Sequence, residues 1–524
     1  MRQSHRLIYN AMVGWVAHVV EVAIGFLLLP FLVHRVGAAG YGIYGLAFSV
    51  SMALDFVRVA LAAALTKFVA GYAAQDSRDD INRVLGTTCA FGWTIGLLAG
   101  GAVIALQNPL ADLMSIAPAD REVFQDSLVA MGVLIAVSFG LMPYLGVLLG
   151  YQRHDLMRLG QAAVRIAQAL LMVGWFVFVG PAVTPLAVIT LICGVLLHLV
   201  WMGAAYRSWP WLRGSPRQFR VDTLKMVLGF AVMMILIGLT AMLMQQGGRW
   251  IVGGMISVDF VTYFTVMTTP AWFIFSAVQD LTLTIMPAAS KYQAADNQLM
   301  LIDLFVRGTR YSLLIAGACV AIFAPILHPL LNLWMGPEFE HLASPMLPLL
   351  VSAGLGGSCS CAHNMLKGLG KPQLVLASSL TSAIISLILM AVAIKVFKAT
   401  DWAVSLGFAT FCVLSCVLQN WLCLRVTEAS WRKLLWQAYG QPLVILVPVV
   451  GGALLLTRKL DVQGVVPTAI SAATTVLAFA LPFSALFFSA EEWQLARETL
   501  QAGLRKLGLS RPAERTGGQE PPSM

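Results

Sequence analysis

Long apolar stretches separated by short connections decide what this chain can fold into. Each is long enough to cross a bilayer, whose hydrocarbon core takes about 20 apolar residues in a helix. Backbone groups in lipid must be satisfied within the spanning segment itself, so each stretch predicts a helix. The sequence therefore predicts an all-α polytopic membrane protein with about 14 transmembrane helices, roughly at 9–34, 41–72, 83–107, 122–150, 157–180, 184–206, 223–247, 255–291, 308–334, 343–368, 373–397, 402–425, 435–457 and 464–489.

Composition excludes an ordinary soluble protein. Of the 524 residues, 59% are hydrophobic and only 11% are charged, whereas about 25% are charged in soluble domains. The net charge of +9 is not gathered into a basic run with interleaved aromatic residues, so no nucleic-acid partner is expected. The eight cysteines lie in apolar segments without a zinc-type spacing, which predicts packing residues and no metal site.

The distribution of lysine and arginine predicts the orientation in the membrane. Of the 34 basic residues, 25 fall on the terminal segments and connections that share one side, and seven fall on the opposite side. The remaining two, Arg58 and Arg165, lie inside apolar segments. Positive charge accumulates on the cytoplasmic side of membrane proteins. Both termini are therefore expected in the cytoplasm, which requires an even number of spans.

Two pairs of similar sequence suggest an internal duplication. Gly71–Ser77 resembles Lys291–Asn297, and Leu149–Arg153 resembles Leu366–Lys371, at offsets of 220 and 218 residues. Both halves would have the same orientation in the membrane. Parallel repeats of this kind are typical of transporters that bind their substrate between the halves.

The basic connection Tyr206–Lys225 separates the two predicted halves. The halves would be six-helix lobes, followed by two accessory helices. Beyond these, one stretch carries apolar residues on a single helical face, as in a helix lying on the cytoplasmic membrane surface. The last residues are polar and Pro-rich, which predicts a disordered tail. The expected domains are an N-lobe at 1–215, a C-lobe at 216–430, accessory helices at 431–490, the amphipathic helix at 491–509 and the tail at 510–524.

Charged residues inside the apolar segments give the first indication of function. An ionised group at bilayer depth costs about 2.5–3.5 kcal/mol, so such residues usually face the protein interior or a water-filled path. Asp55 and Arg58 are three residues apart and share a helix face. Asp280 lies toward the cytoplasmic end of its span. Structural ion pairs, Asp55 with Arg58 and Glu21 with Arg165, are one interpretation, and a substrate path lined by charges is the other.

Other polar residues in apolar surroundings have simpler interpretations. His198, His328 and His363 are expected to be satisfied by hydrogen bonds in the packed interior rather than to relay protons. Arg249, at the end of the seventh span, is expected to reach the membrane interface with its charged group. The sequence has no Walker A motif and no large outer loop with clustered acids, histidines or arginines, so an enzyme is not expected.

The stretch Leu29–Tyr72 carries a resemblance to a known family. It holds Pro30, a turn at Gly37, the sequence Tyr-Gly-Ile-Tyr at 41–44, Asp55, and Lys-Phe-Val-Ala at 67–70. In this pattern it resembles the polysaccharide flippases of the MOP superfamily, the polysaccharide biosynthesis transport proteins that export O-antigen and exopolysaccharide repeat units. Apolar residues replace the Gly that usually follows the aspartate in that family, and Arg58 is added.

The resemblance implies two six-helix lobes around a central cavity, plus two accessory helices. It also implies a flippase that moves a polyprenyl-pyrophosphate-linked oligosaccharide across the bacterial inner membrane by alternating access. On this hypothesis Arg58, Arg165 and Lys67 bind the pyrophosphate, and Glu21, Asp55 and Asp280 couple transport to H⁺ or Na⁺, with no other cofactor. The expected partners are the lipid-linked substrate, membrane lipids and polysaccharide assembly proteins.

Two further functions stay open from the sequence. A multidrug exporter of the same superfamily would bind organic cations in a cavity dominated by acids, with few arginines. A membrane glycosyltransferase or ligase belongs to a different class, and the short outer loops disfavour it. For a flippase, the sugar, the coupling ion and the oligomeric state are undetermined, and a lipid II or teichoic-acid type of substrate is not excluded.

Overall fold

The computed structural model describes residues 2–282, 284–398, 400–459 and 464–487. This part of the chain is helical, with no strand, and twelve of its helices are long and apolar enough to cross a membrane. The prediction of an all-α polytopic membrane protein is therefore confirmed. The total of 14 spans and the cytoplasmic termini stay predictions. The amphipathic helix expected at 491–509 and the tail at 510–524 lie outside the described residues.

The first helix, α1 (Arg2–Ala74), is broken at the turn that the sequence placed near Gly37. Gly37 has φ 77° and ψ 167°, a conformation that glycine adopts readily because it has no Cβ. A single residue therefore reverses the chain between two apolar helices. The break fixes how residues before and after Gly37 face each other.

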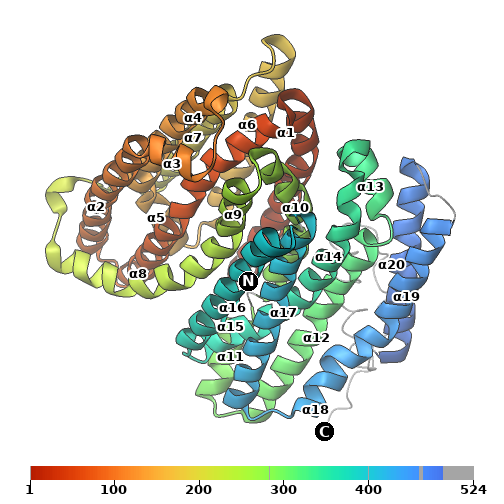
Figure 1. Ribbon diagram of the computed structural model, residues 1–524. Coiled ribbons are helices and arrows are strands. Elements are labelled where there is room, and N and C mark those ends of the chain that lie inside the picture. The colour runs from red at the N-terminus through yellow and green to blue at the C-terminus, as the bar shows by residue number, and fades with distance from the viewer. Residues whose placement is uncertain (1, 283, 399, 460–463, 488–524) are drawn as a thin grey trace, which may run out of the picture.

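The N-terminal helices pack around the second part of α1 (Figure 1). Pro143 begins α5 directly after α4 ends, because proline supplies no backbone N–H to continue the hydrogen-bond ladder. Phe124, Leu128 and Leu65 are among the fully buried side chains of this lobe. Its other helices are α2 (Arg78–Ala105), α3 (Gln107–Leu113), α4 (Arg121–Leu141), α5 (Pro143–Gly150), α6 (His154–Phe178) and α7 (Thr184–Ser208).

The later helices form the second body in Figure 1, whereas α8 runs below α2 and α5 of the first. Helix α8 packs against α1 and α2 as well as against α16, so it contacts both bodies. Helices α19 and α20 pack on α12. The bounds are α8 (Val221–Met242), α9 (Gly248–Met255), α10 (Val258–Thr282), α11 (Ile285–Ala294), α12 (Gln298–Phe323), α13 (Leu327–Trp334), α14 (Ala343–Ser358), α15 (Ser360–Gly368), α16 (Pro372–Phe397), α17 (Thr400–Thr427), α18 (Trp431–Lys433), α19 (Gln441–Lys459) and α20 (Val465–Phe487).

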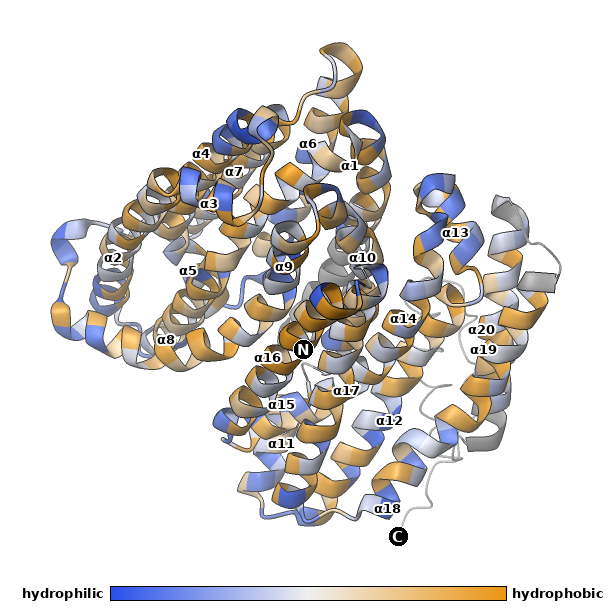
Figure 2. Cartoon of the chain, in the orientation of Figure 1, coloured by the Kyte–Doolittle hydropathy of each residue, from blue (hydrophilic) through white to orange (hydrophobic). Residues whose placement is uncertain are grey.

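Apolar residues cover most of the length of these helices. Figure 2 shows hydrophilic residues at helix ends, for example at α13 and at the turn before α8. Exposed leucine, isoleucine and phenylalanine side chains, such as Leu170 and Phe178 on α6, would be unfavourable in water. They are the expected lipid-facing surface of a membrane protein.

Turns at the predicted repeat offsets have the same backbone geometry. Asp76 and Asp296 both have positive φ, 51° and 50°. In each turn the next amide donates to a tyrosine carbonyl at 3.0 Å, Ser77 to Tyr72 and Asn297 to Tyr292. A second pair of positive-φ residues lies at the other offset. These are Gln152 and Gly370, 218 residues apart. The repeated turns support two related halves, whose exact division stays a prediction.

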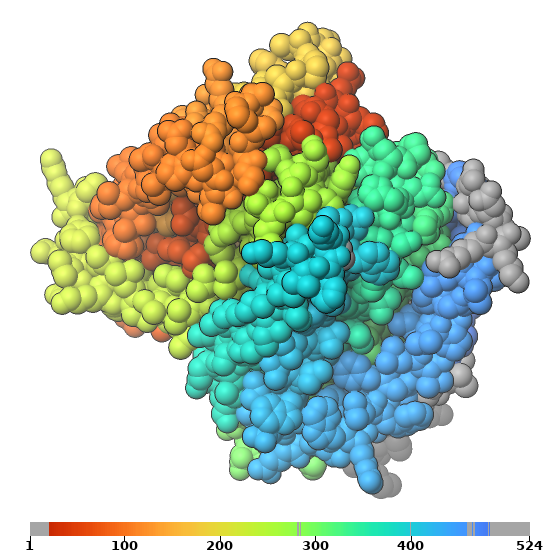
Figure 3. Space-filling model, in the orientation of Figure 1, coloured from red at the N-terminus to blue at the C-terminus, as the bar shows by residue number. Residues whose placement is uncertain are grey.

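The two lobes meet at the end that carries Gly37. Thr262 of α10 donates a 2.7 Å hydrogen bond to the carbonyl of Ala38, and the Trp250 indole of α9 donates to Ser49 at 2.8 Å. On α13, the Trp334 indole donates to the carbonyl of Phe26 at 2.6 Å. By the predicted orientation this end is extracellular. Figure 3 shows a notch in the outline beside α8.

Gly42 packs closely against Val258 of α10 at this end, and it provides a test. A Cβ at Gly42 would overlap the carbonyl oxygen of Val258, whereas a Cβ at Gly45 would meet only Val261 at 3.6 Å. Overpacking costs about 1–3 kcal/mol. Gly42→Ala should therefore open this end, and Gly45→Ala should not. The measurement is the reaction of an impermeant maleimide with a cysteine placed at Thr265, added from outside the cell.

A destabilisation of the closed end by about 1.4 kcal/mol shifts the equilibrium between its closed and open forms tenfold. We therefore expect the labelling of the cysteine to rise about tenfold in Gly42→Ala. Equal labelling of the two alanine variants would mean that the contact at Gly42 does not hold this end closed.

Candidate functional site

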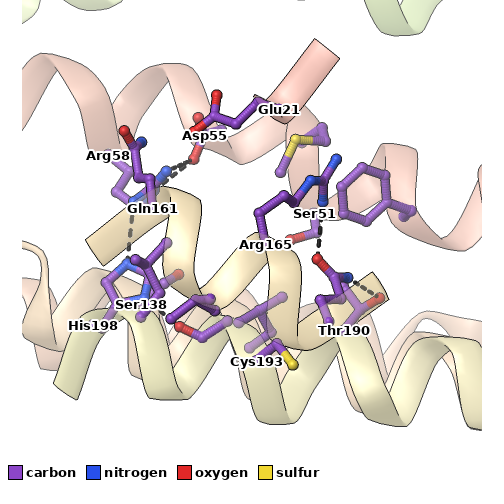
Figure 4. Close-up of a pocket in the computed structure, with 17 residues that line it drawn as sticks. Glu21, Ser51, Asp55, Arg58, Ser138, Gln161, Arg165, Thr190, Cys193 and His198 are labelled. Atoms are coloured by element: carbon purple, nitrogen blue, oxygen red, sulfur yellow. Dashed lines mark hydrogen bonds and ion pairs between the residues drawn. The ribbon is translucent and has the colours of Figure 1, made fainter. Parts of the chain in front are cut away.

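A cavity of about 330 Å³ lies between helices α1, α4, α6 and α7 of the N-terminal lobe (Figure 4). Its charged lining residues are Glu21, Asp55, Arg58 and Arg165. These are four of the six residues predicted to bind substrate or couple ions. Neutral polar residues complete the lining, namely Ser51, Ser138, Gln161, Gln168, Thr190 and His198. The charged residues that the sequence singled out are therefore largely brought together.

Arg58 is held between two partners in this cavity. Its guanidinium forms an ion pair with Asp55, and the side chains are only 17% and 29% exposed. Its Nη1 also lies 3.1 Å from Nε2 of His198. Nδ1 of His198 lies 2.7 Å from the carbonyl oxygen of Gly194, which can only accept, so Nδ1 carries the proton. His198 is then a neutral acceptor for Arg58.

Arg165 is held differently, without a carboxylate. Its Nη1 donates to Oε1 of Gln168 at 2.9 Å. Gln168 in turn donates to Oγ1 of Thr190 at 3.1 Å, and Thr190 lies 2.9 Å from the hydroxyl of Tyr44. This chain of neutral groups positions the guanidinium but leaves its charge uncompensated. Within the described residues Arg165 forms no ion pair, and it is exposed to the cavity.

The remaining predicted site residues differ in their surroundings. Glu21 lines the cavity, is partly buried and has no ion-pair partner among the described residues. The pair of Glu21 with Arg165 that the sequence allowed does not form in this structure. Lys67 is exposed, and its Nζ lies 4.3 Å from the centre of the Phe230 ring on α8. It is not one of the residues that line the cavity. The side chain of Asp280 lies outside what the structure describes.

Most of the polar residues that hold the arginines were not predicted from the sequence. On α6, Gln161, Arg165 and Gln168 follow each other at four and three residues, the spacing of one helix face. That pattern was a usable signal. Oε1 of Gln161 is buried without a hydrogen-bond partner, so the cavity has an unused acceptor beside its charges. His198 was expected to be hydrogen-bonded in the interior, which it is, but its partner is Arg58.

At the predicted repeat offsets, the charged residues of the cavity have no charged counterparts. At the repeat offsets, Phe275 and Val278 correspond to Asp55 and Arg58, and Ala383 corresponds to Arg165. Each replacement is uncharged. Across the described part of the chain, no group of three or more His, Cys, Asp or Glu side chains is arranged to hold a metal ion. The site is therefore a charged cavity of the first lobe.

Comparison with known proteins identifies the fold. No family model matches the sequence, and no curated protein matches it. Among solved structures, the lipid II flippase MurJ in an inward closed conformation matches with a TM-score of 0.71 and 11% identity, covering 92% of this chain and 98% of that one. The inward-facing conformation of a multidrug resistance MATE family transporter of the MOP superfamily matches with a TM-score of 0.67 and 14% identity, covering 80% and 98%.

The chain shares its fold with these two proteins. An outward-facing conformation of a MATE family transporter of the same superfamily matches with a lower TM-score, 0.61, at 12% identity, covering 80% of this chain and 95% of that one. The resemblance seen in the sequence is thus confirmed at the level of the fold, and the protein is a multi-pass membrane protein.

The ion pair between Asp55 and Arg58 predicts a coupled effect on stability. Asp55→Asn leaves a partly buried guanidinium without its counter-charge, so it should lower the melting temperature of the purified protein. Adding Arg58→Gln removes that charge and should restore part of the loss. In a double-mutant cycle the interaction energy should be about 1–3 kcal/mol. Additive effects of the two substitutions would show that the pair contributes nothing to stability.

Proposed function

We propose that this protein is a flippase that moves a polyprenyl-pyrophosphate-linked oligosaccharide across the bacterial inner membrane for cell-surface polysaccharide biosynthesis. The observation that carries the proposal is the state of Arg165. Its guanidinium lines a cavity within the membrane fold and is exposed to that cavity, and among the described residues its hydrogen-bond partner is a neutral amide. A cation presented in this way is suited to an anionic ligand.

A pyrophosphate headgroup fits this arrangement physically. It cannot cross hydrocarbon unaided, because an ionised group at bilayer depth is strongly disfavoured. Arginine forms short, charge-assisted and often bidentate hydrogen bonds to phosphate oxygens. Arg165 would provide the first such contact. Arg58 would be the second, once its bonds to Asp55 and His198 loosen.

Closure at the Gly37 end would make this cavity accessible from the cytoplasmic side, where a lipid-linked substrate is assembled. Transport would follow when the lobes part at the Gly37 end and meet at the other. Glu21 is the free acid of the cavity, so it is the first candidate to take up H⁺ or Na⁺, with Asp55 and Asp280 as the others predicted. Lys67 lies outside the cavity and would attract the headgroup at the entrance.

Two observations support a flippase over a multidrug exporter. The acids of the cavity do not dominate, because Asp55 is neutralised by Arg58 and Arg165 balances Glu21. The match to the MurJ flippase covers 92% of this chain, whereas the MATE match covers 80%.

The test is carried out in a deletion strain of the source organism. Wild type should restore surface polysaccharide and clear lipid-linked repeat units from the inner leaflet. Arg165→Gln should lose at least about tenfold of this activity, since it removes a charge-assisted contact worth about 1.5–3 kcal/mol. The matched control is Arg83→Gln, an exposed arginine on α2 paired with Asp80. It should behave as wild type at equal protein level in the membrane.

Unchanged surface polysaccharide in the deletion strain would contradict the flippase proposal. If the deletion instead raised sensitivity to organic cations, the multidrug exporter would take its place. Full activity of Arg165→Gln, with the deletion defective, would keep the flippase but remove this arginine from substrate binding.

A further inference from the structure

A second, smaller cavity of about 140 Å³ adjoins the first. Phe48, Arg165 and Gln168 line both. The second cavity lies between the lobes, because Arg249 of α9 and Thr265 of α10 also line it. It is situated toward the Gly37 end, where Tyr41 and Tyr44 follow the break in α1. A headgroup leaving the first cavity for the predicted outer side would pass here.

The position of Arg249 differs from the one predicted from the sequence. Instead of reaching the membrane interface, it lines this cavity between the lobes. Its Nη1 donates to Oε1 of Gln246 at 3.2 Å, and its Nε is buried without a hydrogen-bond partner. Within the described residues it forms no ion pair. A buried charged donor left unsatisfied is costly, so an anion at this position would stabilise it.

Arg165 and the two tyrosines complete the surroundings of such an anion. Both arginines are close enough to Tyr41 and Tyr44 to interact electrostatically with them. The hydroxyl of Tyr44 is engaged with Thr190. That of Tyr41 forms no hydrogen bond in the described structure, so it is a free donor. Two guanidinium groups and one hydroxyl therefore surround a space that holds a phosphate group but not an oligosaccharide.

We infer that the second cavity is a binding site for a phosphate-type anion, through which the substrate's pyrophosphate passes on its way outward. The inference rests on the proposed function, since it identifies the anion with the substrate headgroup. Arg165 lines both cavities, so an anion bound to its guanidinium passes from the first cavity to the second. Arg249 then receives it from the opposite lobe, so the transfer occurs as the lobes part at the Gly37 end.

The test separates binding from transport. Purified wild type, Arg165→Gln, Arg249→Gln and Arg249→Lys are titrated with undecaprenyl pyrophosphate. The same variants are scored in the deletion strain for surface polysaccharide and for lipid-linked units at the inner leaflet. Arg35→Gln is the matched control, because Arg35 is an exposed arginine of α1 near the same end. Melting temperatures report on folding.

Arg249→Gln should bind the probe within about twofold of wild type but accumulate inner-leaflet units, with transport reduced at least about tenfold. Arg165→Gln should lose both binding and transport. Arg249→Lys should recover part of the transport, because the charge is kept. The melting temperatures of Arg249→Lys and Arg249→Gln should not fall below that of wild type, since neither substitution removes a salt bridge.

Wild-type transport by Arg249→Gln would overturn the second site while leaving the flippase intact, and so would a lysine variant no better than glutamine. Failure of wild type to bind undecaprenyl pyrophosphate would instead count against the proposed function itself.

Discussion

The positive charge of a guanidinium group at bilayer depth must be compensated by neighbouring groups of the protein. The arrangement of the cavity follows from the partners that compensate each of its arginines. Arg58 is neutralised by Asp55 on the same helix and hydrogen-bonded to His198 on another. In the part of the chain that the structure describes, Arg165 is hydrogen-bonded to Gln168 and forms no ion pair. The charge of Arg58 is therefore compensated by a carboxylate, whereas the guanidinium of Arg165 is held by neutral groups among the described residues.

Helix packing supplies the neutral partners that keep Arg165 in place. Helices α6 and α7 bring Gln168 beside Thr190, and the break at Gly37 brings Tyr44 to the same network. Each hydrogen bond is modest, but together they orient the guanidinium toward the cavity. A carboxylate in place of Gln168 would neutralise the cation, and the proposed contact with an anionic headgroup would then be lost.

Spans and local pairs could be predicted from the sequence, because they depend on local properties. Apolar length predicted the helices, and the spacing of Asp55 and Arg58 predicted that they share a face. The meeting of Arg58 with His198 depends instead on contacts between residues 140 positions apart. No local pattern contains that information.

The position of Arg249 could not be predicted from the sequence either, because it depends on how the two lobes pack. Its position near a span end suggested an interfacial charge, but α9 packs against α1 and places it inside the molecule. The predicted turn at Gly37 was a local property, since glycine favours positive φ. How closely α10 would approach that turn depended on the packing of the two halves.

The central claim is that Arg165 receives a pyrophosphate headgroup in the first cavity. An experimental structure of the protein in a lipid nanodisc with undecaprenyl pyrophosphate tests it most directly. The account predicts diphosphate density within hydrogen-bond distance of the Arg165 guanidinium, with the prenyl chain leaving between helices toward lipid. Diphosphate bound only at the membrane surface, with the cavity containing water and Arg165 still bonded to Gln168 alone, would contradict it.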